Sequence, residues 1–512
     1  MTKDAFTYDS VPYPSYTFPQ THPDRLSTVG SLFGLQAEHP EKCRMLELGC
    51  GDGTNLLSFA YALPGSSFVG IDLSGVHIAK AEDTAKRLGL TNIIFRREDV
   101  THIGRDDLDE FDFIVAHGLF SWVPDAVRPH ILRIFSECLT ETGIGYISYN
   151  AYPGCHLREI SSGIMKYYAD TLDDPSEKVN QGVSFLNFIT GASEKDSLYQ
   201  MMLKLELSEI VDRSAENVFH DDLSDFNQPF YFNEFNSIIG DFGLQFLSEA
   251  DPSASNIGKF SQETQDVLRK LGSDVVRREQ LIDFITCRRF RSTLICRRDA
   301  AVVQQIAPFT IRNLFIAAQL ASEDADPELR DVAGIRFSDP KGASVEINHP
   351  LTKASLVHLR NIHARNIGFD ELMNAARLLL GVEAIDDEEI SKTEQYLMQM
   401  FLAGMIKLHR YQPEFQSTVS DRPTVSLFVR WQIENGCESV TTLVGSNLKP
   451  ENDATRVLLS LLDGTRDRSD IVFSMRETLD VADGEKDRFE SNLPALIETE
   501  LQKFAECGLL IA

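Results

Sequence analysis

The chain has 512 residues and a formal net charge of −28, with 43% hydrophobic and 25% charged residues. This composition is typical of a globular protein with about two to four domains, and it excludes a fibrous or disordered chain. No apolar run is long enough to cross a membrane, and the first residues lack the apolar stretch of a secretory signal. We therefore expect a cytoplasmic protein without membrane insertion.

The charge and the cysteines bear on partners and cofactors. An acidic surface repels phosphate backbones, so nucleic acid is not expected as a partner. It would attract basic partners, such as proteins with exposed lysines, although keeping a large protein in solution is the simpler explanation. The eight cysteines include no C-x-x-C pair, so neither a zinc site nor a redox motif is predicted. We expect no bound metal and a reducing compartment.

The first third of the chain alternates between strand and helix patterns. Strands are predicted at residues 43–49, 66–74, 93–99, 111–117 and 143–150, and helices at residues 54–63, 76–90 and 128–139. Alternation at this length implies right-handed crossovers. The predicted fold class is therefore α/β, with a parallel sheet that carries helices on both faces.

The pattern changes after residue 150. Residues 156–215 and 261–287 look helical, residues 230–251 read as a helix, a glycine and a strand, and residues 290–299 read as a strong strand. Our interpretation is that strands near residues 245–248 and 291–296 complete the sheet, with helical insertions before and between them. The alternative is a separate second domain at about residues 160–300.

Residues 301–512 contain a weak internal repeat. Each copy has a turn, a capped helix, a further helix, one glycine (Gly404 or Gly508) and an apolar strand. This order is typical of winged-helix modules. The expected second helices, FDELMNAAR and SDIVFSMRE, carry no basic stripe, so we favour packing or protein contact over DNA binding. The acidic run at residues 386–389 is predicted to be a solvated loop.

The strongest motif is MLELGCGDGTNL at residues 45–56. An apolar strand ends in Glu47, Gly49, Gly51 and Gly53 at alternate positions, and a helix follows. The missing Cβ atoms permit a sharp turn and close approach of a ligand to the backbone, and the helix start presents unpaired N–H groups. The spacing differs from the dinucleotide fingerprint G-x-G-x-x-G, and an acid precedes the first glycine.

Two acids stand at the ends of the next two predicted strands. Asp72 is placed where a carboxylate can accept both hydroxyls of a ribose. Asp99 is placed where a carboxylate can accept the exocyclic amine of adenine. Each acid alone could equally be a helix cap or part of a solvated turn. Ligands of open parallel sheets bind beyond the carboxyl ends of the strands, so the motif and both acids converge on one predicted site.

Together, these features resemble class I S-adenosylmethionine (SAM)-dependent methyltransferases. The resemblance implies a Rossmann-like fold with a mostly parallel seven-stranded sheet, and SAM as the cofactor. It implies a cofactor site made of Tyr8, Tyr13, Glu47, Gly49, Gly51, Gly53, Asn55, Asp72, Leu73, Asp99, Val100 and His117.

The likeness extends over nearly the whole chain. Residues 8–26, 115–125, 146–154, 220–235 and 461–472 are similar to bacterial methyltransferases with a methyltransferase regulatory domain, among them rickettsial protein-lysine methyltransferases. This implies a homodimer formed through the helices of residues 156–215. It also implies an N-terminal lid segment (1–25), a SAM-binding core (26–155), a helical regulatory region that completes the sheet (156–300), and two winged-helix-like modules (301–412 and 413–512).

The stretch AHGLFSWVP follows a predicted strand and should lie at the same end of the sheet. Our catalytic candidates are His117, Trp122 and Tyr149. His117 could contact SAM through its backbone, act as a base, or be a structural histidine, and backbone contact ranks above base. Aromatic faces attract sulfonium and ammonium cations, and those expected to close the site are Phe120, Trp122, Tyr8, Tyr13, Tyr16 and Phe18.

The absence of two motifs narrows the chemical class of the methyl acceptor. No Asn/Asp-Pro-Pro-aromatic motif follows the strand at residues 111–117, which disfavours nucleobases, and no metal-ligand cluster of the catechol type is present. The favoured function is methyl transfer to an amine, most simply lysine side chains of a protein. The alternatives are a small-molecule methyltransferase and, less favoured, a non-catalytic SAM-binding regulator.

Overall fold

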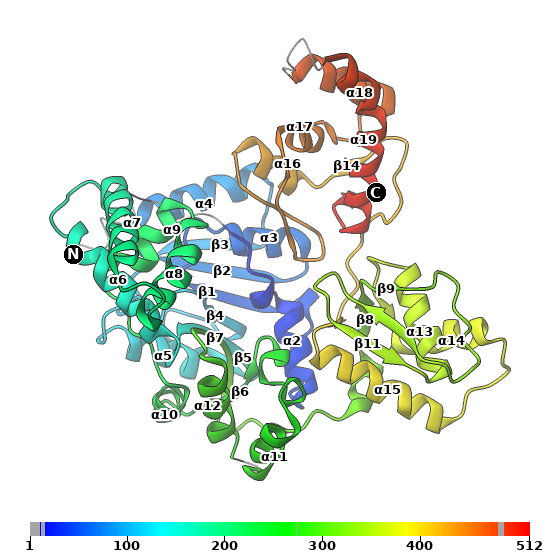
Figure 1. Cartoon of the computed structure of the whole chain (residues 1–512), viewed down its shortest axis with the longest axis horizontal. Helices are drawn as coiled ribbons and strands as arrows, with labels where there is room; N and C mark the ends of the chain where they lie inside the picture. Colours follow the sequence, from blue (N-terminus) through cyan, green and yellow to red (C-terminus); the bar gives the residue numbers. More distant parts are fainter. Residues whose placement is uncertain (1–10, 12–15, 273, 480–485, 512) are drawn as a thin grey trace.

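The computed structural model of the chain describes residues 11, 16–272, 274–479 and 486–511, with the side chains of residues 486–490 left aside. Figure 1 shows a central sheet with helices on both faces, a helical bundle at the left, a middle module at the lower right and a C-terminal module at the upper right. Among the described residues, no helix is long and apolar enough to span a membrane.

The central sheet has seven strands in the order β3-β2-β1-β4-β5-β7-β6. They are β1 Arg44–Leu48, β2 Ser67–Asp72, β3 Ile93–Arg97, β4 Phe111–Ala116, β5 Leu139–Asn150, β6 Leu244–Glu249 and β7 Phe290–Arg297. The first five strands are parallel, whereas β7 runs antiparallel to both β5 and β6. The predicted Rossmann-like, mostly parallel seven-stranded sheet is therefore confirmed. Because β6 and β7 belong to this sheet, the alternative of a separate domain at residues 160–300 is wrong.

Both faces of the sheet are apolar because helices cover both. Successive side chains of each strand point to opposite sides, so every position along a strand faces one of the two cores. On β1, Met45 packs with Phe59 in one core, and Leu46 packs with Phe135 in the other. The helices that cover the first face are α2 Pro23–Leu32, α3 Thr54–Ala62 and α4 Gly75–Arg87, and those on the second face include α5 Arg128–Cys138 and α10 Phe232–Asp241. The near-continuous hydrophobic strands thus follow from burial on two sides.

Four helices between β5 and β6 form their own small core around Met165, Leu186 and Leu203. They are α6 Cys155–Ala169, α7 Pro175–Ala192, α8 Leu198–Val211 and α9 Ala215–Asp222. The chain between β6 and β7 adds α11 Gln262–Lys270 and α12 Val275–Thr286, with short 3-10 helices η3 Pro252–Ser255 and η4 Ile257–Lys259. Figure 1 shows α6–α9 as a bundle beside the sheet, away from the middle module.

The middle module combines a three-stranded sheet, a three-stranded ribbon and three helices. Its elements are η5 Pro308–Asn313, β8 Phe315–Ala318, β9 Ala321–Ser322, β10 Ile335–Ser338, β11 Ser344–Ile347, α13 Pro350–Asn361, β12 Ile367–Gly368, α14 Phe369–Leu380, α15 Asp387–Leu402 and β13 Ile406–His409. The predicted loop at residues 386–389 is wrong. Asp386 caps α15 and the next three acids form its first turn, where the positive end of the helix dipole favours them.

The C-terminal module repeats the order helix, helix, helix, strand. Its elements are β14 Thr424–Val425, α16 Leu427–Glu434, β15 Val440–Thr441, β16 Asn447–Leu448, α17 Asp453–Leu461, α18 Arg468–Thr478, α19 Lys486–Glu506 and β17 Leu510–Ile511. Asp467 and Asp470 form a capping box at the start of α18. The short strands β15 and β16 make a hairpin, the wing of this module.

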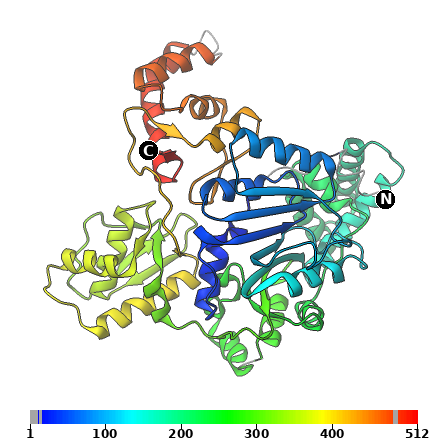
Figure 2. The ribbon, with the colours of Figure 1, turned by 180° about the vertical axis from the view of Figure 1, so that it is seen from behind.

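Helix α2 lies between the central sheet and the middle module, as the two opposite views agree (Figures 1 and 2). Asp24, in its first turn, lies 2.7 Å from His409 Nδ1 and accepts a 2.7 Å hydrogen bond from the backbone N–H of Arg410. The 3-10 helix η1 Pro19–Thr21 precedes α2, and η2 Pro40–Lys42 lies between α2 and β1. The chain start is thus part of the contact between the sheet and the middle module.

Candidate functional site

The glycine motif makes a sharp turn between β1 and α3. Gly49, Gly51 and Gly53 have φ angles of +71°, +55° and +76°, a region that residues with a Cβ rarely adopt. A Cβ at Gly53 would lie 2.5 Å from the Phe95 ring, whereas nothing lies within 4 Å of a Cβ at Gly51. The turn therefore leaves open space above Gly51, as a ligand that approaches the backbone requires.

Glu47 and Asn55 form a buried polar pair beside this turn. The side-chain amide of Asn55 donates to Glu47 Oε1 over 3.0 Å, and Glu47 is 3% exposed. Burial raises the pKa of Glu47 to about 8. Its second oxygen, Oε2, is buried without a hydrogen-bond partner among the described residues. Buried polar atoms normally have such a partner, so this oxygen is available to a polar group of a ligand.

Asp72 and Asp99 lie where the sequence placed them, at the carboxyl ends of β2 and β3. Asp72 Oδ2 accepts a 2.9 Å hydrogen bond from the backbone N–H of Gly51, which holds the carboxylate against the glycine turn. Asp99 Oδ1 accepts two hydrogen bonds from Thr101. Burial acts to raise the pKa of Asp99, but the bonds from Thr101 outweigh it and lower that pKa below its ordinary value. An ionised Asp99 is an acceptor for hydroxyl or amine donors.

Residues 16–22, which we name the N-terminal strap, cross the site. The backbone N–H of Phe18 donates to Asn55 Oδ1 over 2.9 Å, and the Asn55 amide also donates to Thr21 Oγ1 over 3.1 Å. Asn55 thus links the strap to Glu47, the acid of the glycine motif. Tyr8 and Tyr13, which the sequence assigned to the cofactor, lie outside the described residues.

His117 stands at the tip of β4 among aromatic rings. Its ring centroid is 3.9 Å from that of Phe18, and its Nδ1 lies 3.0 Å from the Tyr146 hydroxyl. The Phe290 ring approaches edge-on, with centroids 6.3 Å apart. Burial lowers the pKa of His117 to about 4, so the imidazole is neutral at physiological pH. A neutral ring can lie next to a cation without repulsion, but it is a weaker base than an ordinary histidine.

The other catalytic candidates are placed differently. Tyr149 is 1% exposed and stacks on Phe235 at 4.1 Å in the core on the far face of the sheet. Phe120 is likewise fully buried, against Phe235 and Phe230. Trp122 is partly buried in the turn after β4, where its backbone N–H donates to the backbone carbonyl of Leu119. Of the aromatic residues expected to close the site, Phe18 is the one that the described structure brings onto His117.

Sequence reasoning missed Tyr146 and Phe290 as neighbours of His117. Tyr146 lies on β5 opposite β4, and Phe290 is the first residue of β7, opposite Asn150. The strand register brings both to one end of the sheet. No local motif marks them, because the contact depends on an antiparallel strand that enters the sheet late in the chain.

These residues fit SAM. The open space above Gly51, the free buried oxygen of Glu47 and the carboxylates of Asp72 and Asp99 together offer a cradle with acceptors for amine and hydroxyl groups. Leu73 and Val100, next to the two acids, supply apolar surface and are exposed and partly buried, respectively. Within the described ranges, no group of three or more His, Cys, Asp or Glu residues could hold a metal ion.

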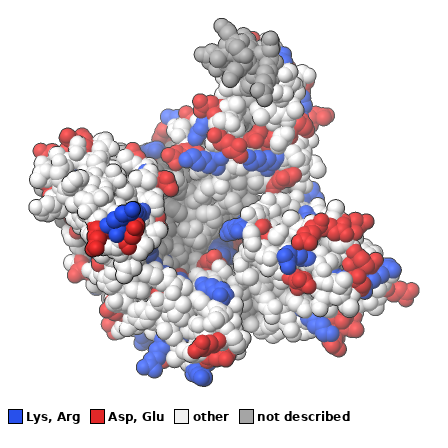
Figure 3. Space-filling view, in the orientation of Figure 1, with Lys and Arg blue, Asp and Glu red and all other residues white. Residues whose placement is uncertain are grey.

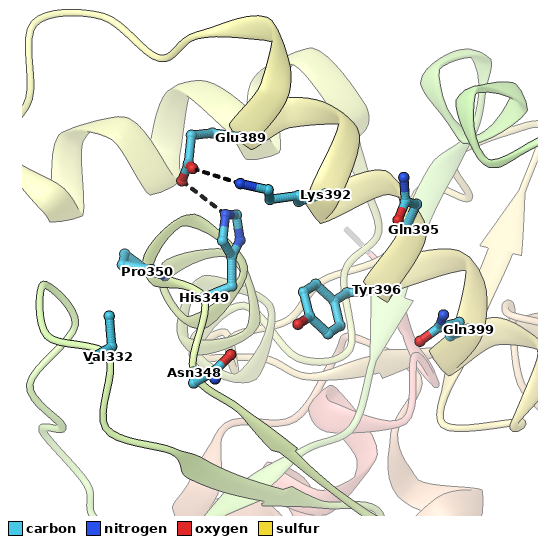
Figure 4. Close-up of a pocket in the computed structure, with 9 residues that line it drawn as sticks. All are labelled: Val332, Asn348, His349, Pro350, Glu389, Lys392, Gln395, Tyr396 and Gln399. Atoms are coloured by element: carbon cyan, nitrogen blue, oxygen red, sulfur yellow. Dashed lines mark ion pairs between the residues drawn. The ribbon is translucent and has the colours of Figure 1, made fainter.

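A separate pocket of about 750 Å³ lies in the middle module, between the start of α13 and α15 (Figure 4). His349 Nε2 lies 2.8 Å from a Glu389 oxygen, and Lys392 lies 3.6 Å from the other. Gln395, Tyr396 and Gln399 continue the lining along α15. None of the motif residues lines this pocket, so it is distinct from the cofactor cradle.

Comparison with known families identifies the fold's relatives. The family "Methyltransferase domain" matches residues 39–204, "Predicted methyltransferase regulatory domain" matches residues 214–297, and "PKMT, C-terminal winged helix domain" matches residues 421–509. An uncharacterised protein of Rickettsia prowazekii is 34% identical over 45% of this chain and 92% of its own length. A second one from that organism is 29% identical over 98% of this chain and 93% of its own length. The chain belongs to the class I SAM-dependent methyltransferases.

A solved relative gives the same result over the full length. The structure of PKMT2 from Rickettsia typhi superposes with a TM-score of 0.87 at 25% identity, covering 98% of this chain and 100% of that chain. A second structure of PKMT2 is a complex with AdoHcy, and it superposes with the same score. SAM is thus the cofactor of this methyltransferase, and the C-terminal winged-helix domain predicted from the repeat is confirmed.

Proposed function

We propose that this methyltransferase transfers the methyl group of SAM to lysine side chains of a protein substrate. The observation that carries the proposal is the match along the whole chain to PKMT2, with the same modules in the same order. The resemblance of the sequence to bacterial protein-lysine methyltransferases supports the same acceptor. The C-terminal winged-helix domain, whose helical stretch SDIVFSMRE carries no basic stripe, then serves to hold or orient a protein.

The site chemistry supports an amine acceptor. SAM, when bound, supplies a methyl group on a sulfonium, and the protein has to align an unprotonated amine with it. Free lysine has a pKa of about 10.4, so the enclosure must favour the neutral amine. Around His117 the chain offers Phe18, Tyr146 and Phe290 and a neutral imidazole. Such surroundings lower the pKa of an amine by desolvation and accommodate cations through the ring faces.

We assign the cofactor to Glu47, Asn55, Asp72 and Asp99, with Gly49, Gly51, Gly53, Leu73 and Val100 as the cradle and Phe18 in the strap as the covering ring. His117 is assigned to the acceptor side of the methyl group, through its ring rather than as a base, since its pKa is lowered to about 4. Trp122 stays a candidate acceptor contact. Tyr149 is not retained, because its hydroxyl is buried in the core.

Radiolabelled SAM added to cell extract with the purified enzyme tests the substrate class. We expect label in protein bands and methyllysine in their hydrolysate. Label confined to the small-molecule fraction would support the alternative of a small-molecule methyltransferase, and tight SAM binding without any label would support a regulator. The Asp72→Ala variant, which removes the carboxylate held by Gly51, is the matched control and should give no label in either fraction.

We further propose a homodimer formed through the helical region. Tyr167, Phe188, Leu198 and Leu205 are 79%, 64%, 83% and 66% exposed on α6, α7 and α8, and the left lobe of Figure 3 is largely free of charged side chains. Large apolar side chains that are exposed together on one helical region favour a contact site there. Sedimentation velocity should show a dimer at micromolar concentration, and Phe188→Asp should shift it to a monomer, whereas Phe473→Asp on α18, which is 67% exposed, should not.

A cytoplasmic location and the domain boundaries stay predictions. All eight cysteines are unpaired, which supports a reducing compartment. The division at residues 25, 155, 300 and 412 rests on the sequence pattern, and limited proteolysis with mass spectrometry would test whether cleavage falls at these joints.

A further inference from the structure

The N-terminal strap is held from two sides. On one side, Asn55 of α3 bonds to the backbone N–H of Phe18 and to the Thr21 hydroxyl. On the other side lies the wing of the C-terminal module. The side-chain amide of Asn447 donates to the carbonyl oxygen of Thr17 over 2.6 Å, and the hydroxyls of Thr17 and Thr441 lie 2.8 Å apart.

The hairpin register explains why these two groups arrive together. Thr441 on β15 is directly opposite Asn447 on β16, and side chains of directly opposed residues lie on the same face of a hairpin. Thr441 is fixed in turn by Gln432 of α16, whose side chain bonds to both its backbone N–H and its hydroxyl. Thr17 is 2% exposed, so its polar groups depend on this hairpin rather than on water.

We propose that Asn447 and Thr441 of the C-terminal module are positioning residues for the SAM site, acting through Thr17 of the N-terminal strap. Thr17 precedes Phe18, whose N–H bonds to Asn55 and whose ring lies on His117. Fixing Thr17 therefore holds Phe18 against Asn55 and against His117.

The wing affects SAM affinity through the fraction of chains in which the strap is in place. If SAM binds tightly only when the strap lies over the cradle, the measured dissociation constant equals the intrinsic one divided by the fraction of chains with the strap in place. Loss of the Asn447 bond lowers that fraction without touching any residue of the cradle. The C-terminal module, remote in sequence from the glycine motif, thereby contributes to cofactor affinity.

Asn447→Asp is the direct test, because Asn447 is exposed and the substitution keeps the shape while replacing the donor by an acceptor. AdoHcy binding is measured by calorimetry, and hydrogen exchange at the Phe18 amide is measured without ligand. We expect the dissociation constant to rise by about threefold to tenfold and the Phe18 amide to exchange faster. The KM for SAM should rise, while kcat at saturating SAM should stay near that of the parent enzyme.

Two further variants separate positioning from a purely structural role. Lys449→Ala, on the same wing with an exposed side chain, should change neither the affinity nor the exchange. Thr17→Val removes the hydroxyl pair from the strap side, where the folding of the C-terminal module does not depend on it, and should weaken AdoHcy binding in the same way. Faster exchange at Phe18 with unchanged AdoHcy affinity in both Asn447→Asp and Thr17→Val would overturn the proposal, as would unchanged exchange in both.

Discussion

The middle and C-terminal modules share a plan but bond to different residues of the chain start, although Tyr411 of the middle module also stacks on His22 at the end of the strap. The middle module ends its repeat with β13 and places His409 and Arg410 on Asp24, inside α2. The C-terminal module reaches past α2 and places its wing on Thr17 in the strap. Thr17 and Asp24 are seven residues apart in the chain. The contact at Asp24 supports the packing of α2, whereas the contact at Thr17 adjoins the cofactor cradle.

The difference teaches that the role of a module is set by the segment it contacts rather than by its fold. Arg410 also bonds to the Ser27 hydroxyl and the Ala37 carbonyl. The middle module is thus tied to a helix whose Leu26 and Val29 belong to the central core and whose Leu32 belongs to the core of the middle module. The C-terminal module packs Phe428 of α16 near Tyr61 of α3, and its hairpin contacts the strap. The following predictions test this division, from the largest expected effect to the smallest.

His409→Ala should affect stability and spare the cofactor site. Asp24 is 5% exposed, and although burial acts to raise its pKa, the neighbouring His409 lowers it below the ordinary value. Removing His409 leaves a buried carboxylate with fewer partners, which should cost about 2 kcal/mol in the free energy of unfolding. Urea unfolding measures the loss.

The AdoHcy dissociation constant of His409→Ala should change by less than about twofold, since the His409 ring bonds to Asp24 in α2, whereas the strap holds Asn55 and His117 through Phe18. Lys341→Ala, exposed in the same module, is the control and should alter stability by less than about 0.5 kcal/mol. A large loss of AdoHcy affinity in His409→Ala would break the proposed division between the two modules.

Phe18→Ala tests the strap itself. The substitution removes the ring that lies 3.9 Å from the His117 ring while keeping the backbone bond to Asn55. An aromatic contact of this kind contributes up to about 1.5 kcal/mol, so AdoHcy binding should weaken by about tenfold. The effect should exceed that of Asn447→Asp, which acts one step further away. An equal or larger effect of Asn447→Asp would mean that the wing acts by another route.

Glu47→Gln tests the protonation of the buried carboxyl in the cofactor cradle. Burial raises the pKa of Glu47 from 4.5 to about 8. Between these values the folded protein keeps a proton that the unfolded chain releases, so stability falls as the pH rises through this window. Without SAM, Glu47→Gln should therefore gain melting temperature at pH 8 relative to pH 5, by about a few degrees. An equal difference from the parent protein at both pH values would show that the carboxyl does not titrate in this range.

His117→Gln should give the smallest effect. Burial lowers the pKa of His117 to about 4, so the imidazole does not change its charge between pH 6 and 9. An amide can still bond to the Tyr146 hydroxyl, and we expect kcat to fall by less than about threefold with an unchanged pH–rate profile. If instead a limb of the profile near pH 6.5 disappears, His117 acts as a base and its assignment changes.

Local patterns predicted much of the fold because they report on burial. The predicted strands at residues 43–49, 66–74 and 111–117 match β1, β2 and β4 within two residues, since a strand buried on both faces reads as an apolar run. The acidic start of α15 was misread as a loop because charge pattern alone does not separate a solvated loop from the first turn of a helix. Distance in sequence hid two contacts around the catalytic candidates: Tyr149 stacks on Phe235 in the core, and Phe290 reaches His117 from β7.

The sequence by itself determined that a glycine turn, Glu47, Asp72 and Asp99, the residues of the proposed cofactor cradle, come together, because each lies at the end of a strand whose partner strands are close in sequence. Their convergence follows from parallel pairing alone. Only the tertiary structure decided what covers that cradle. The strap meets Asn55 on one side and Asn447 on the other, and contacts across more than four hundred residues depend on how whole modules dock, which leaves no periodic trace in the chain.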